Sequence, residues 1–309
     1  MRHLFIVNPI AGGRDHTEEV RAKAEEVFKG REDQYEIYVT KGPMDAAGKI
    51  KAEAEKGDHI RVYACGGDGT FNECANGAAL MKNVAVCPFP VGTGNDFCRM
   101  FGDEGELYRD LSAMVDGSET PMDLIKCGDR YSANICSVGI DARIGTNVHK
   151  YTKVVGGSGA YVVSAVVEMF KGIAKHLVVR SGDFVSDCKH TLVCICNGRF
   201  YGGGFNPVPD AMPNDGLMDV LVVDKVSLFT FAALIKKYSE GRADEFKKYV
   251  KHIRTDELEI EFDEENVVNI DGEAIFAKEV NMKLIPGAMN LIVPRGMHFF
   301  DKSAPSEKA

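Results

Sequence analysis

The chain has 309 residues, enough for two domains, and its hydrophobic (45%) and charged (27%) fractions are ordinary for a globular protein. A formal net charge of −9 speaks against broad nucleic-acid binding, and no basic cluster stands out that could hold anionic lipid by charge alone. No apolar run approaches the length of a membrane span, and the run Leu4–Val7 is too short for a signal peptide. We therefore expect a soluble, cytoplasmic protein.

The first 125 residues alternate between expected strands and helices joined by short loops. Helices are expected after Asp15, after Pro43 and over Phe71–Met81. The strands between them are Leu4–Val7, Tyr35–Thr40, Ile60–Cys65 and Val84–Phe89. This alternation predicts an α/β nucleotide-binding domain over residues 1–124, Rossmann-like and with a mostly parallel sheet.

The texture changes after Asp123 to short runs rich in Val, Ile, Leu and Tyr, which predict an antiparallel β-sandwich over residues 125–294. Two helices are expected to interrupt it, near Ala160–Phe170 and Leu228–Tyr238. Residues 295–309 should form a tail that returns to the first domain, and the active site should lie in the cleft between the domains. The expected strands are Tyr131–Val138, Leu177–Arg180, Leu192–Cys196, Val220–Val223, Leu258–Phe262, Val267–Ile270, Met282–Ile285 and Leu291–Val293.

The nine cysteines are odd in number and include no Cys-x-x-Cys pair, so we expect reduced thiols and no zinc site. Cys194 and Cys196 flank Ile195 in an apolar run. Alternate residues of a strand point to the same face, which predicts both thiols on one face as small hydrophobic groups.

The strongest chemical signal is Gly66-Gly67-Asp68-Gly69-Thr70, which lies between an expected strand and an expected helix. Glycines let the backbone approach a ligand closely, and the amino end of the helix suits phosphate. Asp68 would repel phosphate by itself, but it fits a role in holding Mg²⁺ or its water shell. A plain Asp-Gly turn is the alternative.

Two further loops follow strands of the same sheet. Pro90–Phe97 contains Gly92-Thr93-Gly94 and opens another helix, and Asn8–Gly13 follows the first strand. Carboxyl ends of parallel strands meet at one edge, so the three loops together predict a nucleotide site. The sequence lacks a Walker P-loop, a complete Gly-x-Gly-x-x-Gly pattern and the protein-kinase signatures.

These three elements resemble the diacylglycerol kinase catalytic-domain family, which includes bacterial diacylglycerol kinases and sphingosine kinases. Asn95-Asp96-Phe97 separates the chain from the more distant NAD kinases, which share Gly-Gly-Asp-Gly. The resemblance continues at Pro213–Asp219 and at Asp271-Gly272-Glu273, so it spans nearly the whole chain.

The resemblance implies a role for each matching residue. Glu273 would be the general base that takes the proton of the lipid hydroxyl, and Asp68 would act with the ATP-bound magnesium. A second Mg²⁺ would be bound by Asp215 and the backbone carbonyls of Met212 and Leu217. ATP would be held by Asn8, Pro9, Ile10, Ala11, Gly12, Thr40, Gly66, Gly67, Asp68, Gly69, Thr70, Phe71, Asn72 and Thr93.

Structural alternatives remain open at several of these positions. Asp271-Gly272 is also a strong hairpin signal, and Asp215-Gly216 is as consistent with a turn as with metal binding. The first loop lacks a lysine, and Arg14 is its nearest cation, which leaves the partner of the β- and γ-phosphates open. The segment Phe200–Phe205, with three glycines between aromatic residues, is interpreted as a flexible apolar lip that touches lipid, with a wide turn as the alternative.

The sequence thus predicts an ATP- and Mg²⁺-dependent lipid kinase that phosphorylates the hydroxyl of a membrane lipid, with diacylglycerol as the default acceptor and phosphatidic acid as its product. A soluble-metabolite kinase of the NAD kinase type and a catalytically inactive nucleotide or lipid sensor are the alternatives. The expected partners are a lipid alcohol, the inner face of the membrane in transient peripheral contact and, in a homodimer, a second copy of the chain. Nucleic acid is not expected.

Overall fold

The computed structural model describes residues 1–309 except 93, 156–162, 165–166, 170 and 304–309, with backbone only for 148–155 and 302–303. The chain divides into two compact units. Unit 1 comprises Met1–Leu124, Met212–Asp215 and Pro286–Ala309, and unit 2 comprises Ile125–Ala211 and Gly216–Ile285. The returning segment thus begins at Pro286, earlier than the expected residue 295, because Asn290 and Leu291 pair with a strand of unit 1.

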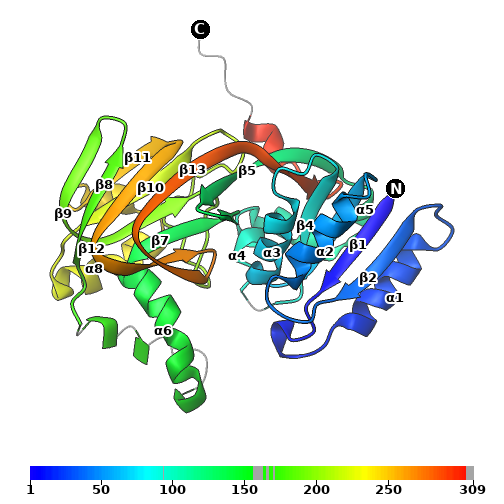
Figure 1. The fold of residues 1–309 in the computed structure, drawn as a ribbon, viewed down its shortest axis with the longest axis horizontal. Coiled ribbons are helices and arrows are strands. Elements are labelled where there is room, and N and C mark those ends of the chain that lie inside the picture. The colour runs from blue at the N-terminus through cyan, green and yellow to red at the C-terminus, as the bar shows by residue number, and fades with distance from the viewer. Residues whose placement is uncertain (93, 156–162, 165–166, 170, 304–309) are drawn as a thin grey trace, which may run out of the picture. The chain divides into compact units, whose positions relative to one another are not determined.

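Unit 1 is built on parallel strands, of which β1, β2, β3 and β4 are labelled in Figure 1. In the order β2-β1-β3-β4, each strand pairs with its neighbour in parallel, and the end of β13 adds to β4 in the same sense. Both β3 and β4 are buried along their whole length, as their largely apolar sequences require when both faces are covered, and the one charged residue, Arg61, donates to the Val115 carbonyl. The strands are β1 Arg2–Val7, β2 Gln34–Val39, β3 Ile60–Gly66, β4 Val84–Pro90 and β13 Glu273–Val293.

Helices follow the strands of unit 1 along the chain. The helix α3 begins at Asp68 and not at the expected Phe71, because the Phe71 amide already donates a helical hydrogen bond to the Gly67 carbonyl. Asp68 therefore lies in the first turn of a helix. The helical segments of unit 1 are η1 Ala11–Gly13, α1 Thr17–Phe28, α2 Asp45–Ala54, α3 Asp68–Ala78, α4 Asp96–Arg99, η2 Gly102–Arg109, α5 Leu111–Val115 and η4 Phe299–Ser303.

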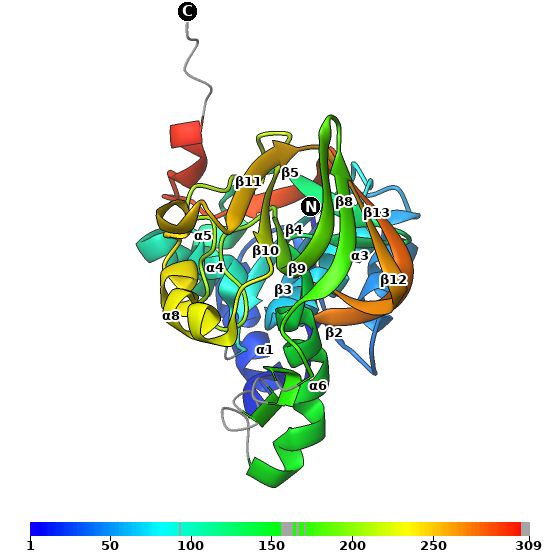
Figure 2. The same cartoon turned by 90° about the vertical axis from the view of Figure 1, so that its left-hand side faces the viewer.

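Unit 2 is dominated by antiparallel strands, as the sequence predicts; Figure 2 shows β8, β9, β10 and β11. The order is β11-β10-β9-β7-β12-β13, and β8 pairs with both β9 and β12. The strands are β5 Ser118–Cys127, which begins in unit 1, β6 Arg130–Ser132, β7 Ile135–Gly139, β8 Lys175–Ser181, β9 Phe184–Cys196, β10 Met218–Asp224, β11 Val250–Thr255 and β12 Glu257–Ile270.

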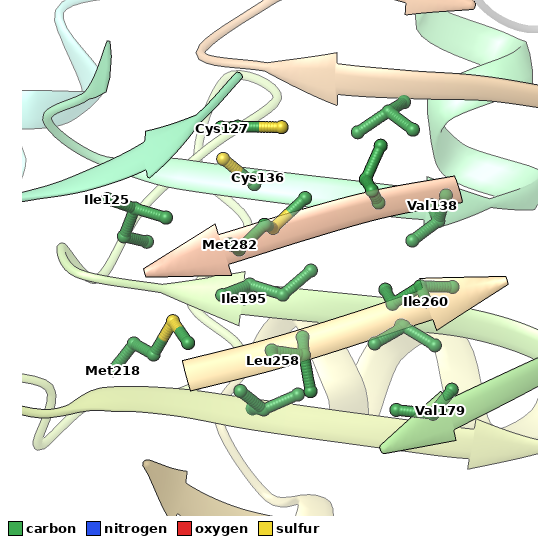
Figure 3. Packing of buried hydrophobic residues seen from close by; sticks show 14 of the residues in the cluster. Ile125, Cys127, Cys136, Val138, Val179, Ile195, Met218, Leu258, Ile260 and Met282 are labelled. Carbon is green, nitrogen blue, oxygen red and sulfur yellow. The ribbon is translucent and has the colours of Figure 1, made fainter. Parts of the chain in front are cut away.

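The main core of unit 2 joins side chains of one set of strands, β9 and β10, to those of another, β12 and β13. Figure 3 shows Ile195 and Met218 from one set near Leu258, Ile260 and Met282 from the other. Alternate residues of β9 leave this core for a second cluster on the opposite face. Cys194 and Cys196 lie there together, with their sulfur atoms 3.5 Å apart, which confirms their predicted shared face.

Several expected elements of unit 2 differ from the structure. The expected strand Tyr131–Val138 is split into β6 and β7, and the expected strands Leu258–Phe262 and Val267–Ile270 are both parts of β12, which has an irregularity between Glu261 and Asn266. The helix α6 Ile140–Val155 was not predicted. Helix α8 Leu228–Ser239, followed by η3 Ala243–Phe246, confirms the expected Leu228–Tyr238. The expected helix Ala160–Phe170 falls largely outside the described residues.

Within the described part of the chain, no helix combines the length and the apolar character needed to cross a membrane.

Candidate active site

Three loops of unit 1 meet where β1, β3 and β4 end. The amide of Asn8 donates to the Cys65 carbonyl at 3.0 Å, and its side-chain amide donates to Thr70 Oγ1 at 3.1 Å. The amides of Val91 and Gly92 both donate to the Gly66 carbonyl at 3.1 Å. These bonds join the loops that the sequence singled out into one set of backbone turns.

Close backbone approach explains why glycine occupies this set of turns. A Cβ added to Gly92 would lie 2.6 Å from the Gly67 Cα, and one added to Gly12 would lie 2.4 Å from the Val91 carbonyl oxygen. At Gly66, a Cβ would meet Thr70 Oγ1 at 2.2 Å. Real side chains do not come so close, so larger residues would push the loops apart.

Asp68 connects two of these loops from the first turn of α3. Its Oδ1 accepts the Phe97 amide at 3.0 Å, and a Cβ on Gly94 would lie 3.0 Å from its Oδ2. The rings of Phe71 and Phe97 pack beneath, with centroids 4.2 Å apart. Asp68 thus fixes the start of α4 against α3, a structural role that the sequence did not indicate.

The other residues predicted to hold ATP lie around the same loops. Ile10 is 81% exposed, and the Thr40 amide and hydroxyl both face the Val7 carbonyl at the end of β1. Asn72 is buried, and its carbonyl oxygens accept the side-chain amide of Asn76. Thr93 lies outside the described residues.

Glu273 opens β13 in unit 2, directly after the turn Asp271-Gly272. Its carboxylate forms an ion pair with Arg130, and both side chains remain more than a third exposed. The turn has a left-handed backbone, with φ of 47° at Asp271 and 92° at Gly272. The hairpin interpretation therefore holds, and it is compatible with a base at Glu273.

The Asp271 carboxylate is an anchor that the sequence did not reveal. It accepts the Ser132 hydroxyl at 2.6 Å and the amides of Ala133, Asn134 and Ile135 at 2.7 to 3.3 Å. These bonds replace strand pairing at Ala133 and Asn134, which explains why the expected strand is split there. The turn before Glu273 is consequently held from the side by four donors.

The candidate magnesium residues lie in a short segment of the chain that contains Met212 and Asp215 in unit 1 and Leu217 in unit 2. Asp215 is exposed. The adjacent Asn214 has a buried Oδ1 with no hydrogen-bond partner among the described residues. Mg²⁺ prefers oxygen ligands, so the oxygen-bearing side chains of these two consecutive residues are of the chemical type that such an ion takes.

The same segment is tied to the rest of unit 1 through Asp123, which the sequence analysis did not single out. The Asp123 amide donates to the Pro213 carbonyl at 2.7 Å, and its Oδ1 accepts the Gly287 amide at 2.8 Å. The sequence offered no clear signal for this role, because the burial of Asp123 is evident only in the structure.

The lip interpretation of Phe200–Phe205 is wrong. Tyr201 and Phe205 pack against a buried cluster, and the Tyr201 hydroxyl lies 3.0 Å from that of Tyr238 and donates to Asp141 at 3.1 Å. Burial raises the pKa of Asp141 to about 6, although hydrogen bonds from Ser137 and Tyr201 oppose the shift. Left-handed φ angles at the three central glycines make the segment a turn that directs its aromatic rings inward.

Arg14 is the cation nearest the first loop. It is largely exposed and pairs with Glu19 at 3.2 Å.

Comparison with known proteins agrees with this arrangement. Residues 2–127 match the family model of the diacylglycerol kinase catalytic domain, and residues 134–293 match that of the YegS C-terminal NAD kinase beta sandwich-like domain. Two curated relatives are each named "Probable lipid kinase YegS-like". The one from Pseudomonas aeruginosa is 30% identical over 291 residues (92% of this chain, 93% of the relative), and the one from Serratia proteamaculans is 28% identical over 310 residues (98% of each).

A solved structure of a "putative diacylglycerol kinase" from Bacillus anthracis superposes with a TM-score of 0.74 at 26% identity, over 94% of this chain and 96% of that one. The chain therefore belongs to the family of YegS-like lipid kinases, which combine the diacylglycerol kinase catalytic domain with a β-sandwich-like domain.

Proposed function

We propose that this lipid kinase transfers the γ-phosphate of ATP to the hydroxyl of a membrane lipid, with diacylglycerol as acceptor and phosphatidic acid as product. The observation that carries the proposal is the joining of the three glycine-containing loops, through Asn8, Gly66 and Gly92, at the ends of β1, β3 and β4. Phosphoryl transfer depends mainly on positioning and on neutralising charge, and such loops serve both.

The ATP phosphates are expected at the amino end of α3. This helix of 11 residues presents free amides and the positive end of its dipole beside Gly67 and Gly69. Gly69 has nothing within 4 Å of an added Cβ, so phosphate oxygens can reach the backbone there. Asp68 Oδ1 is engaged by Phe97, which leaves Oδ2 to act with the ATP-bound magnesium.

Glu273 is the proposed base. Because Arg130 donates to Oε2, the ion pair orients the carboxylate and leaves Oε1 to accept the proton of the lipid hydroxyl. Asp271 supports this geometry by fixing the turn. General-base help of this kind contributes about 10²- to 10⁴-fold to the rate.

A bound Mg²⁺ would supply charge neutralisation, and Asp215 and the carbonyls of Met212 and Leu217 would hold it. The buried Oδ1 of Asn214 adds a further oxygen next to Asp215. The residues of this segment would thus hold a divalent ion by oxygen donors alone.

Membrane contact is proposed at the start of α8. Phe229 is 89% exposed, more than any other large hydrophobic residue in the described part of the chain, and Leu228 beside it is 47% exposed. Lys225 is also exposed just before the helix. Apolar side chains that insert and a cation that meets anionic headgroups suit transient binding to a lipid surface.

The test is transfer of label from γ-labelled ATP to mixed micelles of diacylglycerol, other lipid alcohols or NAD. Wild type should label diacylglycerol, and Glu273→Gln should lose about 10²-fold or more of the rate while still binding ATP. Glu279→Gln, at an exposed glutamate of the same strand, is the matched control and should keep full activity.

Each outcome separates the candidates. Label on another lipid alcohol would keep the lipid kinase and change its acceptor. Label on NAD alone would make the chain a soluble-metabolite kinase. ATP binding without transfer to any acceptor would favour a sensor, and equal loss in both variants would remove Glu273 from its role.

A further inference from the structure

Three side chains of unit 2 with metal-binding chemistry meet at a place to which neither the proposed reaction nor the proposed magnesium ion assigns a role. Cys188 and His190 are two residues apart on β9, and Asp224 ends β10 opposite His190. One donor atom from each lies within 4.8 Å of the other two. They are the only such group of His, Cys, Asp and Glu side chains found among the described residues.

From this cluster we infer a binding site for a divalent transition-metal ion, Zn²⁺ by ligand type, held by the Cys188 thiolate, the His190 imidazole and the Asp224 carboxylate. Sulfur, nitrogen and oxygen donors together select Zn²⁺ over Mg²⁺ or Ca²⁺, which prefer oxygen alone. The site is therefore chemically distinct from the proposed magnesium segment at Asp215.

The contacts within the cluster run through both nitrogens of the His190 ring, of which one ion can bind only one. Zn²⁺ at its usual bond lengths places sulfur and nitrogen ligands about 3.6 Å apart and nitrogen and oxygen ligands about 3.4 Å apart. Here Cys188 Sγ lies 3.6 Å from His190 Nε2 and 3.9 Å from Asp224 Oδ1, and His190 Nδ1 lies 3.4 Å from that Oδ1. Of these separations, the one between Nδ1 and Asp224 Oδ1 matches a single ion, and one donor atom from each of the three residues lies within 4.8 Å of the other two.

An independent sign of a ligand comes from His190 itself. Its side chain is fully buried, and Nδ1 makes no hydrogen bond among the described residues although it lies 3.4 Å from Asp224 Oδ1. A hydrogen bond with the Ser186 backbone also orients the His190 ring. A histidine that binds a metal through one nitrogen commonly donates from the other to the backbone, so a buried Nδ1 that lies near the Asp224 carboxylate without a hydrogen bond fits that pattern.

Lys251 is the cation that a metal ion would have to compete with at Asp224, since its ammonium also lies 3.4 Å from Oδ1. Its ammonium lies 3.3 Å from Asp224 Oδ2 and 3.5 Å from the Ser186 hydroxyl. In a simple network Lys251 is the cation that Asp224 needs. In a metal site it competes with the ion, so its removal should tighten metal binding, by about tenfold for one charge a few ångströms away.

The thiol is open to direct measurement. All nine cysteines lie in the described part of the chain, and Cys188 is the only one that is not buried. Zn²⁺ binding would displace the thiol proton to solvent, which removes the nucleophile that alkylating reagents need.

The experiment is a Co²⁺ titration of the reduced, metal-free full chain, followed by competition with Zn²⁺. We expect one Co²⁺ per chain, with a near-ultraviolet thiolate-to-cobalt absorption band. Cys188→Ser should abolish the band, Asp224→Asn should weaken Zn²⁺ affinity about 10- to 100-fold, and Lys251→Met should strengthen it. His176→Gln, which removes a histidine paired with Asp187 and Asp263 on the adjacent β8, is the control and should change nothing.

Alkylation gives a second measurement that does not depend on the variants folding. Iodoacetamide should modify Cys188 first in the metal-free wild type, and Zn²⁺ should slow that reaction more than Mg²⁺ does. Absence of the thiolate band, a band that survives Cys188→Ser, or alkylation that Zn²⁺ leaves unchanged would each overturn the inference.

Discussion

The contact between Gly67 and Gly92 allows a paired test of how the nucleotide loops are assembled. The contact is asymmetric: a Cβ on Gly92 would lie 2.6 Å from the Gly67 Cα, whereas a Cβ on Gly67 would lie 3.6 Å from the Gly92 Cα. Neither glycine has a positive φ, so alanine at either position introduces no left-handed strain. Gly92→Ala should therefore separate the loops, and Gly67→Ala should leave them in place.

The size of the effect follows from the distances. An ordinary contact begins at 3.4 Å, so Gly92→Ala requires a movement of about 0.8 Å (3.4 minus 2.6) between two backbone segments. Overpacking of this kind costs about 1–3 kcal/mol. The same movement stretches the bonds from Val91 and Gly92 to the Gly66 carbonyl, which hold the loops together.

The assay compares urea unfolding of both variants by circular dichroism, because the chain has no tryptophan to report by fluorescence. Titration with ATP follows on the folded proteins. Gly92→Ala should lose about 1–3 kcal/mol of stability and bind ATP at least several-fold more weakly, while Gly67→Ala should stay within about 0.5 kcal/mol of wild type. Equal destabilisation by the two variants would refute the asymmetric contact, and unchanged ATP affinity in Gly92→Ala would separate these loops from the nucleotide.

Three other changes probe unit 2. Asp271→Asn should lower the free energy of unfolding by about 1–3 kcal/mol, because the new amide group cannot accept the backbone hydrogen that Oδ2 now accepts. Hydrogen exchange at the amides of residues 133–135 should accelerate, and unchanged exchange would contradict the anchoring role of Asp271. Burial raises the pKa of Asp141 from 3.8 to about 6, so the folded state favours the protonated carboxyl, and the stability that this contributes at low pH is lost as pH rises through 6. Asp141→Asn should flatten the pH dependence of the unfolding midpoint between pH 4 and 7. An identical slope in the variant would contradict the role of Asp141. Phe229→Ser should weaken flotation with anionic vesicles about tenfold, unlike Val185→Ser at another exposed apolar position, and equal binding by both would remove α8 from the membrane contact.

Local chemistry accounts for what the sequence could predict. Gly66–Thr70 and Asn8–Gly12 were recognisable because each loop follows a short apolar strand and carries glycine where the backbone must approach closely. The alternating pattern of β9 likewise placed Cys194 and Cys196 on one face. In each case the information lies within a few residues of the feature.

Interactions between distant segments account for most of what the sequence missed. The break in the expected strand Tyr131–Val138 depends on Asp271, which is more than 130 residues away along the chain. The two short strands expected near the end of the chain are parts of the single β13, which continues through Pro286 and Gly287. Its last residues pair with β4 while its first pair with β12, so proline and glycine mark a change of partner and not an end.

The cluster of Cys188, His190 and Asp224 depends on the pairing register between β9 and β10. Their spacing of two residues places Cys188 and His190 on one face of any strand, but that pair alone is an ordinary feature of a sheet. Asp224 joins them only because the pairing of β10 with β9 shifts between Val223 and Asp224, which brings Asp224 opposite His190. Without the shift, regular alternation would pair Asp224 with Thr191, whose side chain belongs to the opposite face. The three donors can therefore be found only from the paired strands, and a single irregularity in the sheet separates a scattered set of polar residues from a candidate metal site.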